Sequence, residues 1–457
     1  MRSALFVLAL LASCSPGPQP APLRESAHPV DTAAGGEVAA IRAAAHRLNG
    51  GARDYDSLLA ITREAIFVLL GESTHGTDEF YRERARITRR LVEEQGFTAM
   101  AIEGDWPAAE RVNRYVRGMG SDRSATEALT GFTRFPEWMW PNAPTRELVE
   151  WMRGYNAGKP AEAQVGFYGM DLYSLTESVD AMVRTLETID PGAARATRQR
   201  LRCFESYRDR PEAYGEAAAS RESRSCRDEA AAVVTDLQRR FAAAPRPADA
   251  AQAEARFSVL QNARVVQNAE EYYRMSFVGG ISPWNLRDRH MVETLDALSA
   301  HLQAGGRTPK VVAWAHNTHM GDARVTEPGE QGEWNVGQLM RQRADGRAVL
   351  VGFTTYTGTV LAARQWGGRA ERRPLRPALP GSYGALFHDT NVGNFLLVFR
   401  GNEALQSVLE KPRLERAVGV LYLPETERAS HYFLASLSRQ FDAVIHFDTT
   451  HAVAALR

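Results

Sequence analysis

Short apolar runs that end at a glycine or an acidic residue constrain the fold most. Residues 65–70 are six apolar residues followed by Gly71, and residues 98–102 are a second, mostly apolar run followed by Glu103. Runs of this kind are typical of strands that are buried on both faces of a sheet. Between the two runs, residues 77–95 have helical periodicity and end before a glycine. A strand, a helix and a strand in this order predict a βαβ unit, and hence a parallel sheet.

The remaining apolar runs predict further strands, at residues 164–168, 310–314, 348–354, 395–400, 418–423 and 443–447. Residues 358–364 are expected to pair with the strand 348–354 as a hairpin, and residues 367–382 to form a loop. Residues 38–48 are expected to form a helix. The predicted fold class is α/β, with a mostly parallel sheet flanked by helices and a large inserted helical subdomain.

The helical subdomain is predicted from a long stretch that contains no clear strand pattern. Its expected helices are rich in Ala, Arg, Glu and Gln and cover residues 175–201, 225–244, 248–274 and 286–303. We therefore expect an α/β domain in two parts, residues 37–174 and 306–457, with residues 175–305 as the helical insertion.

The charge balance excludes some classes of partner. The chain has 55 Lys plus Arg and 55 Asp plus Glu, so its formal net charge is zero. This balance gives no indication of binding to nucleic acid or to an anionic membrane surface. No apolar run beyond residue 20 has the length of a membrane span. We expect a globular protein with a small-molecule partner.

The N-terminus resembles a lipoprotein-type signal peptide, residues 1–14. Arg2 is followed by nine apolar residues, 4–12, and then by Cys14 in the sequence Leu-Ala-Ser-Cys, which resembles a bacterial lipobox. The prediction is an exported protein that is lipid-anchored through Cys14 at the cell envelope, facing the periplasm or the exterior. Residues 15–36 are expected to be a flexible tether. The alternative is a secretory signal with an incidental cysteine.

Two cysteines remain after this segment, Cys203 and Cys226. An even number of cysteines in an exported chain favours a disulfide. A loop of this length should stabilise the fold by roughly 3 kcal/mol on the chain-entropy model. The alternative is two free thiols.

Candidate functional residues follow four of the predicted strands. Because ligands bind beyond the carboxyl ends of parallel strands, residues at these positions should meet in one site. The set comprises Glu72, His75, Glu103, Asp105, Asp171, His316 and His319. Three histidines and four carboxylates at successive strand ends favour a single catalytic site.

Each candidate also has a structural interpretation. Glu72 and His75 can be turn residues, although the glycines beside them, Gly71 and Gly76, allow the backbone to approach a ligand closely. Glu103 can be a buried ion-pair partner, and His316 and His319 can be hydrogen-bonded loop residues. Arg84 is expected either on the surface, exposed to solvent, or in an ion pair with Glu103. Trp106 and residues 138–140 are expected in the core, with a place in the wall of a substrate site open for 138–140.

The residue types favour hydrolysis by an activated water molecule without a cofactor. A serine nucleophile motif is absent because His75 stands where Gly-x-Ser-x-Gly requires its last glycine, and no phosphate-binding glycine motif occurs. His75 is suited to deprotonate water, a carboxylate such as Glu72 or Glu103 to orient it, and an arginine to stabilise an oxyanion. The alternative is a zinc site in the same pocket, although no complete His-Glu-x-x-His motif is present.

Several motifs together resemble the erythromycin esterase family. They are Gly-Glu-Ser-Thr-His-Gly-Thr at 71–77, Glu-Gly-Asp-Trp at 103–106, Trp-Asn-Leu-Arg-Asp-Arg-His-Met at 284–291, Trp-Ala-His-Asn-Thr-His at 314–319, Thr-Glu-Arg-Ala-Ser-His-Tyr-Phe at 426–433 and Phe-Asp-Ala-Val-Ile at 441–445. The resemblance covers roughly residues 40–455. It implies an α/β domain with an inserted helical part and a deep cleft between them.

The resemblance also implies an activity and its residues. A macrolide lactone ester would be hydrolysed without metal by water that His75 activates, with Glu72, Arg84, Glu103, His316 and His319 as the other functional residues. Gly384 departs from the family, where an acidic residue is expected, and this bears on which substrate is accepted. The family is broader than its antibiotic-resistance members. Its wider relatives include haem-binding proteins, so a non-catalytic lipoprotein with haem on His75 or His316 is a further alternative.

Overall fold

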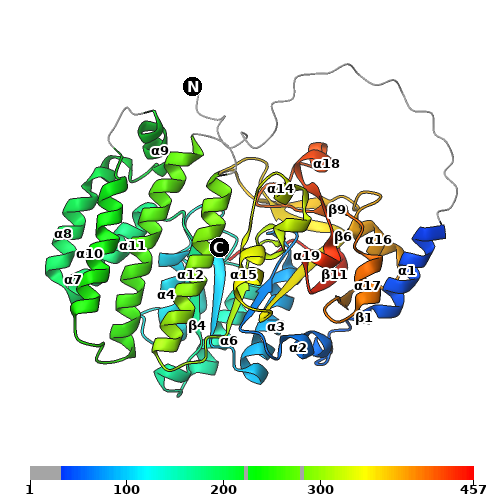
Figure 1. Ribbon diagram of the computed structural model, residues 1–457, viewed down its shortest axis with the longest axis horizontal. Helices are drawn as coiled ribbons and strands as arrows, with labels where there is room; N and C mark the ends of the chain where they lie inside the picture. The colour runs from blue at the N-terminus through cyan, green and yellow to red at the C-terminus, as the bar shows by residue number, and fades with distance from the viewer. Residues whose placement is uncertain (1–31, 221–224, 278–281, 457) are drawn as a thin grey trace.

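The computed structural model describes residues 32–220, 225–277 and 282–456 (Figure 1). The predicted signal peptide 1–14, its lipid-bearing Cys14 and most of the predicted tether lie outside the described residues. Helix α1 (Thr32–Ala44) begins inside the predicted tether, so the expectation of a flexible tether up to residue 36 is wrong for its last five residues. The helix expected at 38–48 ends earlier, because the chain then enters the short strand β1 (His46–Arg47).

A nine-stranded sheet forms the centre of the molecule, with the order β1-β8-β11-β6-β2-β5-β3-β4 and β7 paired to β6. Strands β2 (Phe67–Leu70), β5 (Val311–Trp314), β3 (Ala99–Asp105) and β4 (Gly166–Asp171) are parallel neighbours. Strand β6 (Ala348–Ala362) pairs in parallel with β2 and with β11 (Ala443–Thr450). Strands β1, β7 and β8 (Phe395–Val398) are antiparallel to their neighbours. The predicted mostly parallel α/β sheet is confirmed.

The hairpin predicted at 348–364 is wrong, because both halves belong to one long strand, β6. Gly358, the first residue of the expected second strand, lies within β6, where a Cβ atom would collide with the backbone of Thr450 in β11. The actual partner is β7 (Glu371–Leu375), which lies inside the predicted loop 367–382.

The strand predicted at 418–423 is also absent. Its backbone hydrogen bonds are divided between the turn after β2, through Val418, and the residue after β6, Ala363. The strands on either side of this segment, β9 (Arg413–Arg416) and β10 (Tyr432–Ala435), pair with each other as a two-stranded antiparallel ribbon.

Helices cover both faces of the sheet. Helix α3 (Asp78–Gln95) connects β2 to β3 and ends at Gly96 in the left-handed conformation, as the sequence predicts. The others outside the helical part are α2 (Asp56–Thr62), α4 (Trp106–Val116), α5 (Ala125–Leu129), α6 (Ala143–Asn156), α13 (Asn317–Met320), α14 (Glu327–Glu330), α15 (Val336–Arg343), α16 (Tyr383–Asp389), α17 (Glu403–Val408), α18 (Glu427–Ser430) and α19 (Leu437–Gln440). Two apolar clusters of buried residues lie against the sheet.

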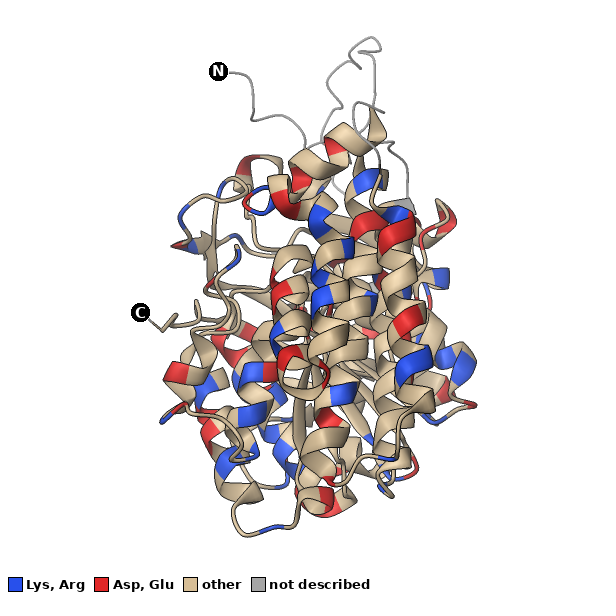
Figure 2. Cartoon of the chain, turned by 90° about the vertical axis from the view of Figure 1, so that its left-hand side faces the viewer, with Lys and Arg blue, Asp and Glu red and all other residues tan. Residues whose placement is uncertain are grey.

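The helical part lies between β4 and β5 in the sequence and stands beside the β4 edge of the sheet (Figure 1). Its helices are α7 (Leu175–Ile189), α8 (Pro191–Arg200), α9 (Pro211–Ala219), α10 (Arg227–Ala243), α11 (Ala250–Ser276) and α12 (Ser282–Ala304). The single helix predicted at 175–201 is two helices, because Pro191 starts α8 and Asp190 caps it. This part has its own apolar core, and Figure 2 shows acidic and basic residues interspersed along its helices.

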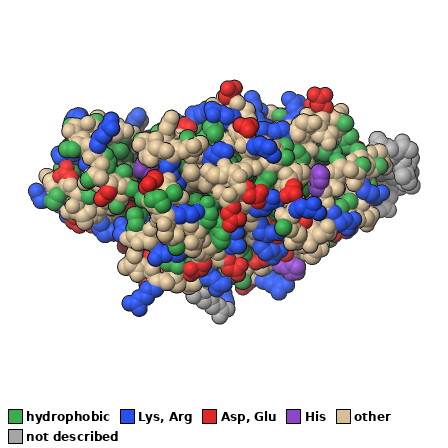
Figure 3. Space-filling model, turned by 90° about the horizontal axis from the view of Figure 1, so that it is seen from below, with side chains coloured by type: hydrophobic (Ala, Val, Ile, Leu, Met, Phe, Trp, Pro, Cys, Tyr) green, Lys and Arg blue, Asp and Glu red, His purple; other side chains and the backbone are tan. Residues whose placement is uncertain are grey.

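The predicted disulfide joins Cys203, in a 3₁₀ turn (Leu201–Tyr207), to Cys226 at the start of α10. It fastens two segments of the helical part to each other. Within the residues that the structure describes, no helix is both long and apolar enough to cross a membrane. Basic and acidic side chains are mixed on the face shown in Figure 3, which agrees with the zero net charge.

Candidate functional site

The ends of four parallel strands meet at one edge of the sheet. Two adjoining cavities of about 350 and 240 Å³ lie there, and they share the lining residues His75, Glu103, Arg287 and Gly419. We call these two cavities together the cleft. The predicted set comes together around it: His75, Glu103, Asp105, Asp171, His316 and His319 line the cleft, and Glu72 lies buried beside His75.

Glu72 holds His75 in one orientation. Its Oε1 lies 2.8 Å from the Nδ1 of His75, and its Oε2 accepts a hydrogen bond of 2.7 Å from Arg84. Because a carboxylate accepts, Nδ1 carries the proton and Nε2 is left with a lone pair. Arg84 and Glu72 are both fully buried, which corrects the expectation that Arg84 lies on the surface or pairs with Glu103.

Aromatic rings on either side compensate for the burial of Arg84. Its guanidinium lies 4.7 Å from the ring centroid of Tyr81 and 4.7 Å from that of Trp314. Tyr81 also donates a hydrogen bond to the carbonyl of His75. Two residues of α3 therefore hold the turn that carries His75, Arg84 through its ion pair with Glu72 and Tyr81 through its hydrogen bond.

Glu103 is a buried anion between two parts of the site. Its Oε2 accepts the backbone N–H of His316 at 2.9 Å, and its Oε1 accepts from Arg287 at 2.6 Å. Burial raises the pKa of Glu103, but His319 and Arg287 outweigh burial and hold it well below its usual range. Glu103 is thus the ion-pair partner of an arginine on α12, which the sequence interpretation had not identified.

Arg287 binds a second carboxylate as well. Asp171 accepts two hydrogen bonds from it, 3.0 Å from Nε and 2.7 Å from Nη2. Burial raises the pKa of Asp171, and Arg287 reverses the shift and lowers it. A guanidinium with two carboxylates is rigidly placed, so Arg287 joins the helical part to the ends of β3 and β4 at the cleft.

His319 has an unusually high affinity for a proton. Its Nδ1 lies 2.9 Å from Asp288, and its ring stacks on Trp284 at 4.4 Å. Burial lowers the pKa of His319, but Asp288 and Glu103 outweigh burial and raise it to about 9. Arg287 donates to Nε2 at 2.9 Å, a bond that only a neutral ring can accept. Protonation of His319 therefore requires this N–H of Arg287 to turn away.

His316 is a neutral ring with a free donor. Burial and the neighbouring His75 hold its pKa well below the usual range. Its Nδ1 accepts from the backbone N–H of Thr318 at 3.3 Å, so the ring proton lies on Nε2. This Nε2 is buried and has no hydrogen-bond partner among the described residues. The rings of His75 and His316 are 5.0 Å apart.

Close backbone packing explains the two glycines beside His75. A Cβ atom on Gly71 would collide with the side chain of Asn317, and one on Gly76 with the backbone of Leu361. The close approach expected for a ligand is instead an approach to other parts of the chain. These contacts place the turn after β2 firmly against α13 and β6.

Apolar and aromatic side chains line the smaller cavity together with the charged groups. They include Phe132, Pro136, Met139, Trp140, Tyr173, Trp366 and Val420. Trp366 is 45% exposed and packs edge-on against Phe135, with ring centroids 5.0 Å apart. Of the tryptophan-rich loop 138–140, Met139 and Trp140 line the cleft, whereas Trp106 belongs to the core as expected.

Gly384 does not line the cleft. It lies in α16, where a Cβ atom would come within 2.8 Å of Ala378 and 2.9 Å of the Thr355 carbonyl. An acidic side chain would not fit at this position without a shift of the surrounding backbone.

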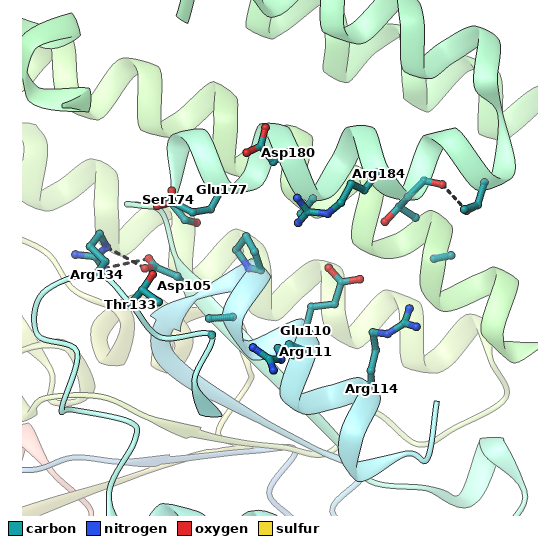
Figure 4. A pocket seen from close by; sticks show the side chains of 17 residues that line it. Asp105, Glu110, Arg111, Arg114, Thr133, Arg134, Ser174, Glu177, Asp180 and Arg184 are labelled. Atoms are coloured by element: carbon teal, nitrogen blue, oxygen red, sulfur yellow. Dashed lines mark hydrogen bonds and ion pairs between the residues drawn. The ribbon is translucent and has the colours of Figure 1, made fainter. Parts of the chain in front are cut away.

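A further cavity of about 590 Å³ lies between α4 and α7 (Figure 4). Glu110, Arg111 and Arg114 extend into it from α4, opposite Glu177, Asp180 and Arg184 of α7. The ion pair of Asp105 with Arg134 lines both this cavity and the cleft, and so separates them. Across residues 32–220, 225–277 and 282–456, no three His, Cys, Asp or Glu side chains are grouped as ligands of a metal ion.

Sequence reasoning assigned no role to Trp284, Arg287 and Asp288. All three lie on α12, on the helical part rather than at a strand end. Their spacing of i, i+3 and i+4 places them on one side of the helix. The motif at 284–291 contains this spacing, so the sequence does indicate that the three side chains lie together.

Comparisons with known proteins agree with this architecture. The family model of erythromycin esterase matches residues 92–450. Erythromycin esterase type II from Escherichia coli is 22% identical over 417 residues, which covers 86% of this chain and 92% of that protein. The structure of a succinoglycan biosynthesis protein has a TM-score of 0.75 at 20% identity, covering 93% of this chain and 100% of the other. A mutant of the erythromycin esterase EreC in its open conformation has a TM-score of 0.59 at 17% identity, covering 87% of this chain and 94% of the other.

Proposed function

The chain belongs to the erythromycin esterase family, whose name denotes esterase-type hydrolases, and we propose that it hydrolyses a carboxylic ester, such as a macrolide lactone, with water that His75 activates. The observation that carries this proposal is the pair of histidines at the cleft. His75 has a carboxylate on Nδ1 and a lone pair on Nε2, and His316 offers a buried Nε2–H with no partner among the described residues.

In the proposed reaction, Nε2 of His75 takes a proton from water while the water oxygen attacks the ester carbonyl carbon. Glu72 stabilises the imidazolium that forms, as a carboxylate does in other histidine-based hydrolytic sites. The tetrahedral intermediate then loses the alkoxide, which takes the proton from His75. Hydrolysis leaves one carboxylic acid group and one hydroxyl group, which stay in the same molecule when the ester is a lactone, and the enzyme returns to its starting state.

The developing oxyanion requires donors that are fixed in advance. The Nε2–H of His316 is such a donor, because its ring is held by Thr318 and its turn by Glu103. The Nη1–H of Arg287 is a second candidate, because it must turn away from His319 when that ring is protonated. Asp171 and Glu103 neutralise the charge of Arg287, so it can act through a directed hydrogen bond.

The shape of the cleft favours a substrate with a large apolar part. The smaller cavity is lined both by charged groups and by aromatic and aliphatic residues, so an ester with its carbonyl at His75 would have apolar side chains such as Met139 and Trp366 available for its apolar portion. A macrolide has this character, and so do other bulky esters. No observation favours the metal-dependent or haem-binding alternatives, which stay hypotheses.

The test is incubation of the purified protein with erythromycin, with and without a chelator, followed by mass spectrometry. Addition of one water in both samples supports the proposal. Addition that chelation abolishes contradicts the metal-free mechanism, and no addition removes macrolides from the proposal, so that a panel of bulky esters follows. His75→Ala should abolish turnover, whereas the control His388→Ala, which pairs with Asp448 outside the cleft, should not.

We also propose that the protein is exported and lipid-anchored through Cys14, on the strength of residues 1–14 and of a disulfide in the helical part. Labelling with a fatty acid in cells tests this, with Cys14→Ser as the matched control. Label that persists in the variant would contradict the proposed anchor.

A further inference from the structure

The larger cavity of the cleft contains a carboxylate without a partner. Glu333 lines this cavity together with His75 and His316, and it is partly buried. Its side chain makes no hydrogen bond and no ion pair within the part of the chain that the structure describes. The other carboxylates that line the cleft are paired: Glu103 and Asp171 with Arg287, and Asp105 with Arg134. Glu333 is therefore available to a ligand.

The backbone on either side of Glu333 is fixed, and it is tied to the start of α12. The N–H of Glu333 donates to the carbonyl of Pro328 at 3.1 Å, and the N–H of Trp334 donates to Oδ1 of Asn285 at 2.9 Å. Nε1 of Trp284 donates to the carbonyl of Trp334, also at 2.9 Å. A carboxylate on a backbone that is held in this way loses little freedom when it binds a ligand.

A second acceptor without a donor belongs to the same cavity. Gln440 lines the cavity and is 1% exposed, and its Oε1 has no hydrogen-bond partner among the described residues. A buried acceptor is costly to leave unpaired, so an oxygen in this state indicates a donor that a bound molecule supplies. The larger cavity therefore offers one charged and one neutral acceptor, and the molecule that fits it carries hydrogen-bond donors.

The electrostatics of the cleft favour a cation over a neutral donor. Carboxylates outnumber cations among its lining residues even when His319 is protonated, because Arg287 serves two carboxylates and Glu333 has no partner. Burial and the neighbouring Asp288 raise the pKa of Glu333, and the charge of His319 opposes this shift. A cation beside Glu333 would compensate both for its burial and for the excess of negative charge.

Aromatic side chains complete this part of the wall. Trp284 and Phe433 line the larger cavity together with Glu333 and Gln440. Aromatic faces attract cations, and they also contact the carbon atoms that an organic cation carries. A carboxylate, a neutral acceptor and aromatic rings in one cavity are suited to an alkylammonium ion, whose N–H binds an acceptor and whose alkyl groups pack on the rings.

We propose that Glu333 is a specificity-determining residue, which binds an alkylammonium group of the substrate in the larger cavity. His75 lines both cavities, so a substrate with its ester carbonyl at His75 can extend into each of them. The substrate class is then a bulky ester with a protonated amine on one side of the carbonyl and an apolar portion on the other. Glu333 takes no part in the chemical step, so its loss should affect binding and not turnover.

The substrate class rests on the proposed ester hydrolysis, so the test has one arm without turnover and one with it. The first arm is calorimetric titration of the full protein with benzyldimethylammonium ion, which contains no ester. Glu333→Gln should weaken its binding roughly tenfold. The matched control Glu330→Gln removes an exposed carboxylate of α14 that does not line the cleft, and it should bind like the wild type. No binding to the wild type, or equal binding to the wild type and Glu333→Gln, overturns the proposed site.

The second arm is the hydrolysis of two p-nitrophenyl esters of equal size. The acyl chain of one ends in a dimethylammonium group, and that of the other ends in the isosteric but neutral isopropyl group. Glu333→Gln should raise KM for the cationic ester roughly tenfold and leave its kcat nearly unchanged. Both constants of the neutral ester should stay the same in this variant, because the isopropyl group makes no ionic contact with Glu333.

Two outcomes of the second arm overturn the specificity role. One is an unchanged KM for the cationic ester in Glu333→Gln. The other is an equal loss of kcat for both esters, which would show that Glu333 maintains the shape of the cleft. If the wild type hydrolyses neither ester, the proposed function fails for these substrates, while calorimetry still decides whether Glu333 binds the ammonium group.

Discussion

The rings of His75 and His316 lie 5.0 Å apart at the cleft, and the proton of each ring is on a different nitrogen. Glu72 fixes the proton of His75 on Nδ1, and the backbone N–H of Thr318 leaves the proton of His316 on Nε2. One ring can therefore accept a proton and the other can donate a hydrogen bond. This division of roles between two residues of one type comes from their neighbours, not from the side chains themselves.

Substitution of either ring should separate the two roles. His75→Gln removes the base and should lower kcat by about 10²–10⁴-fold. His316→Phe removes the donor and should lower kcat by about 10²–10³-fold, the usual effect of losing one oxyanion donor. Ester hydrolysis and circular dichroism measure the two effects. Rescue by added imidazole in His75→Gly, but not in His316→Gly, would distinguish a base from a donor, and equal rescue of both would contradict the assignment.

Arg84 should matter for stability as well as for activity. Arg84→Met leaves the carboxylate of Glu72 buried without its cation, and breaking a buried pair in this way costs about 3–5 kcal/mol. Urea unfolding measures the loss. Arg82→Met is the matched control on the same helix, since Arg82 is half exposed and its pairs are worth no more than about 1 kcal/mol. Equal losses for both variants would contradict the role given to burial.

The sequence predicts the centre of the sheet well because β2 to β5 are continuous apolar runs between helices, and such runs have few other places in a fold. The prediction fails where a local sequence feature is explained by contacts with a segment that is distant in the sequence. Residues 358–364 are expected as a second strand, but Gly358 lies inside β6 in close contact with β11. Residues 418–423 are expected as a strand, but their backbone hydrogen bonds are divided between two segments.

The same distinction applies to the candidate site. The rule that strand ends converge places Glu72, His75, Glu103, His316 and His319 together without knowledge of the fold. It cannot place Arg287, which reaches the cleft from a helix of the inserted part. Nor can it show that Arg84 is buried, because a charged residue on an amphipathic helix is normally exposed. Partners of buried charges depend on how distant segments pack.

Asp288→Asn should reveal the charge of His319 through the pH dependence of stability. The pKa of His319 is raised to about 9, above that of an unfolded histidine near ~6.5, so its stabilising contribution is fully present below the unfolded value and is lost as pH rises through about 9. The variant keeps an acceptor for the backbone N–H of Val336 but lacks the charge. The difference in unfolding free energy between wild type and variant should therefore be largest near pH 6 and smallest above pH 9, with each limit good to about one pH unit. A difference that does not change with pH would contradict a raised pKa.

Trp366 should determine which esters bind rather than how fast they react. It lines the smaller cavity of the cleft, is 45% exposed, and packs against the ring of Phe135. Removal of its indole should raise KM for a bulky apolar ester by roughly tenfold, equivalent to the burial of part of a large apolar side chain, and should leave kcat nearly unchanged. A small ester such as p-nitrophenyl acetate does not extend to this wall, so its KM should stay the same in Trp366→Ala.

Leu434→Ala is the matched control, because Leu434 is similarly exposed at 41% but does not line the cleft. A loss of kcat that is equal for large and small esters would show instead that Trp366 maintains the geometry of the catalytic groups.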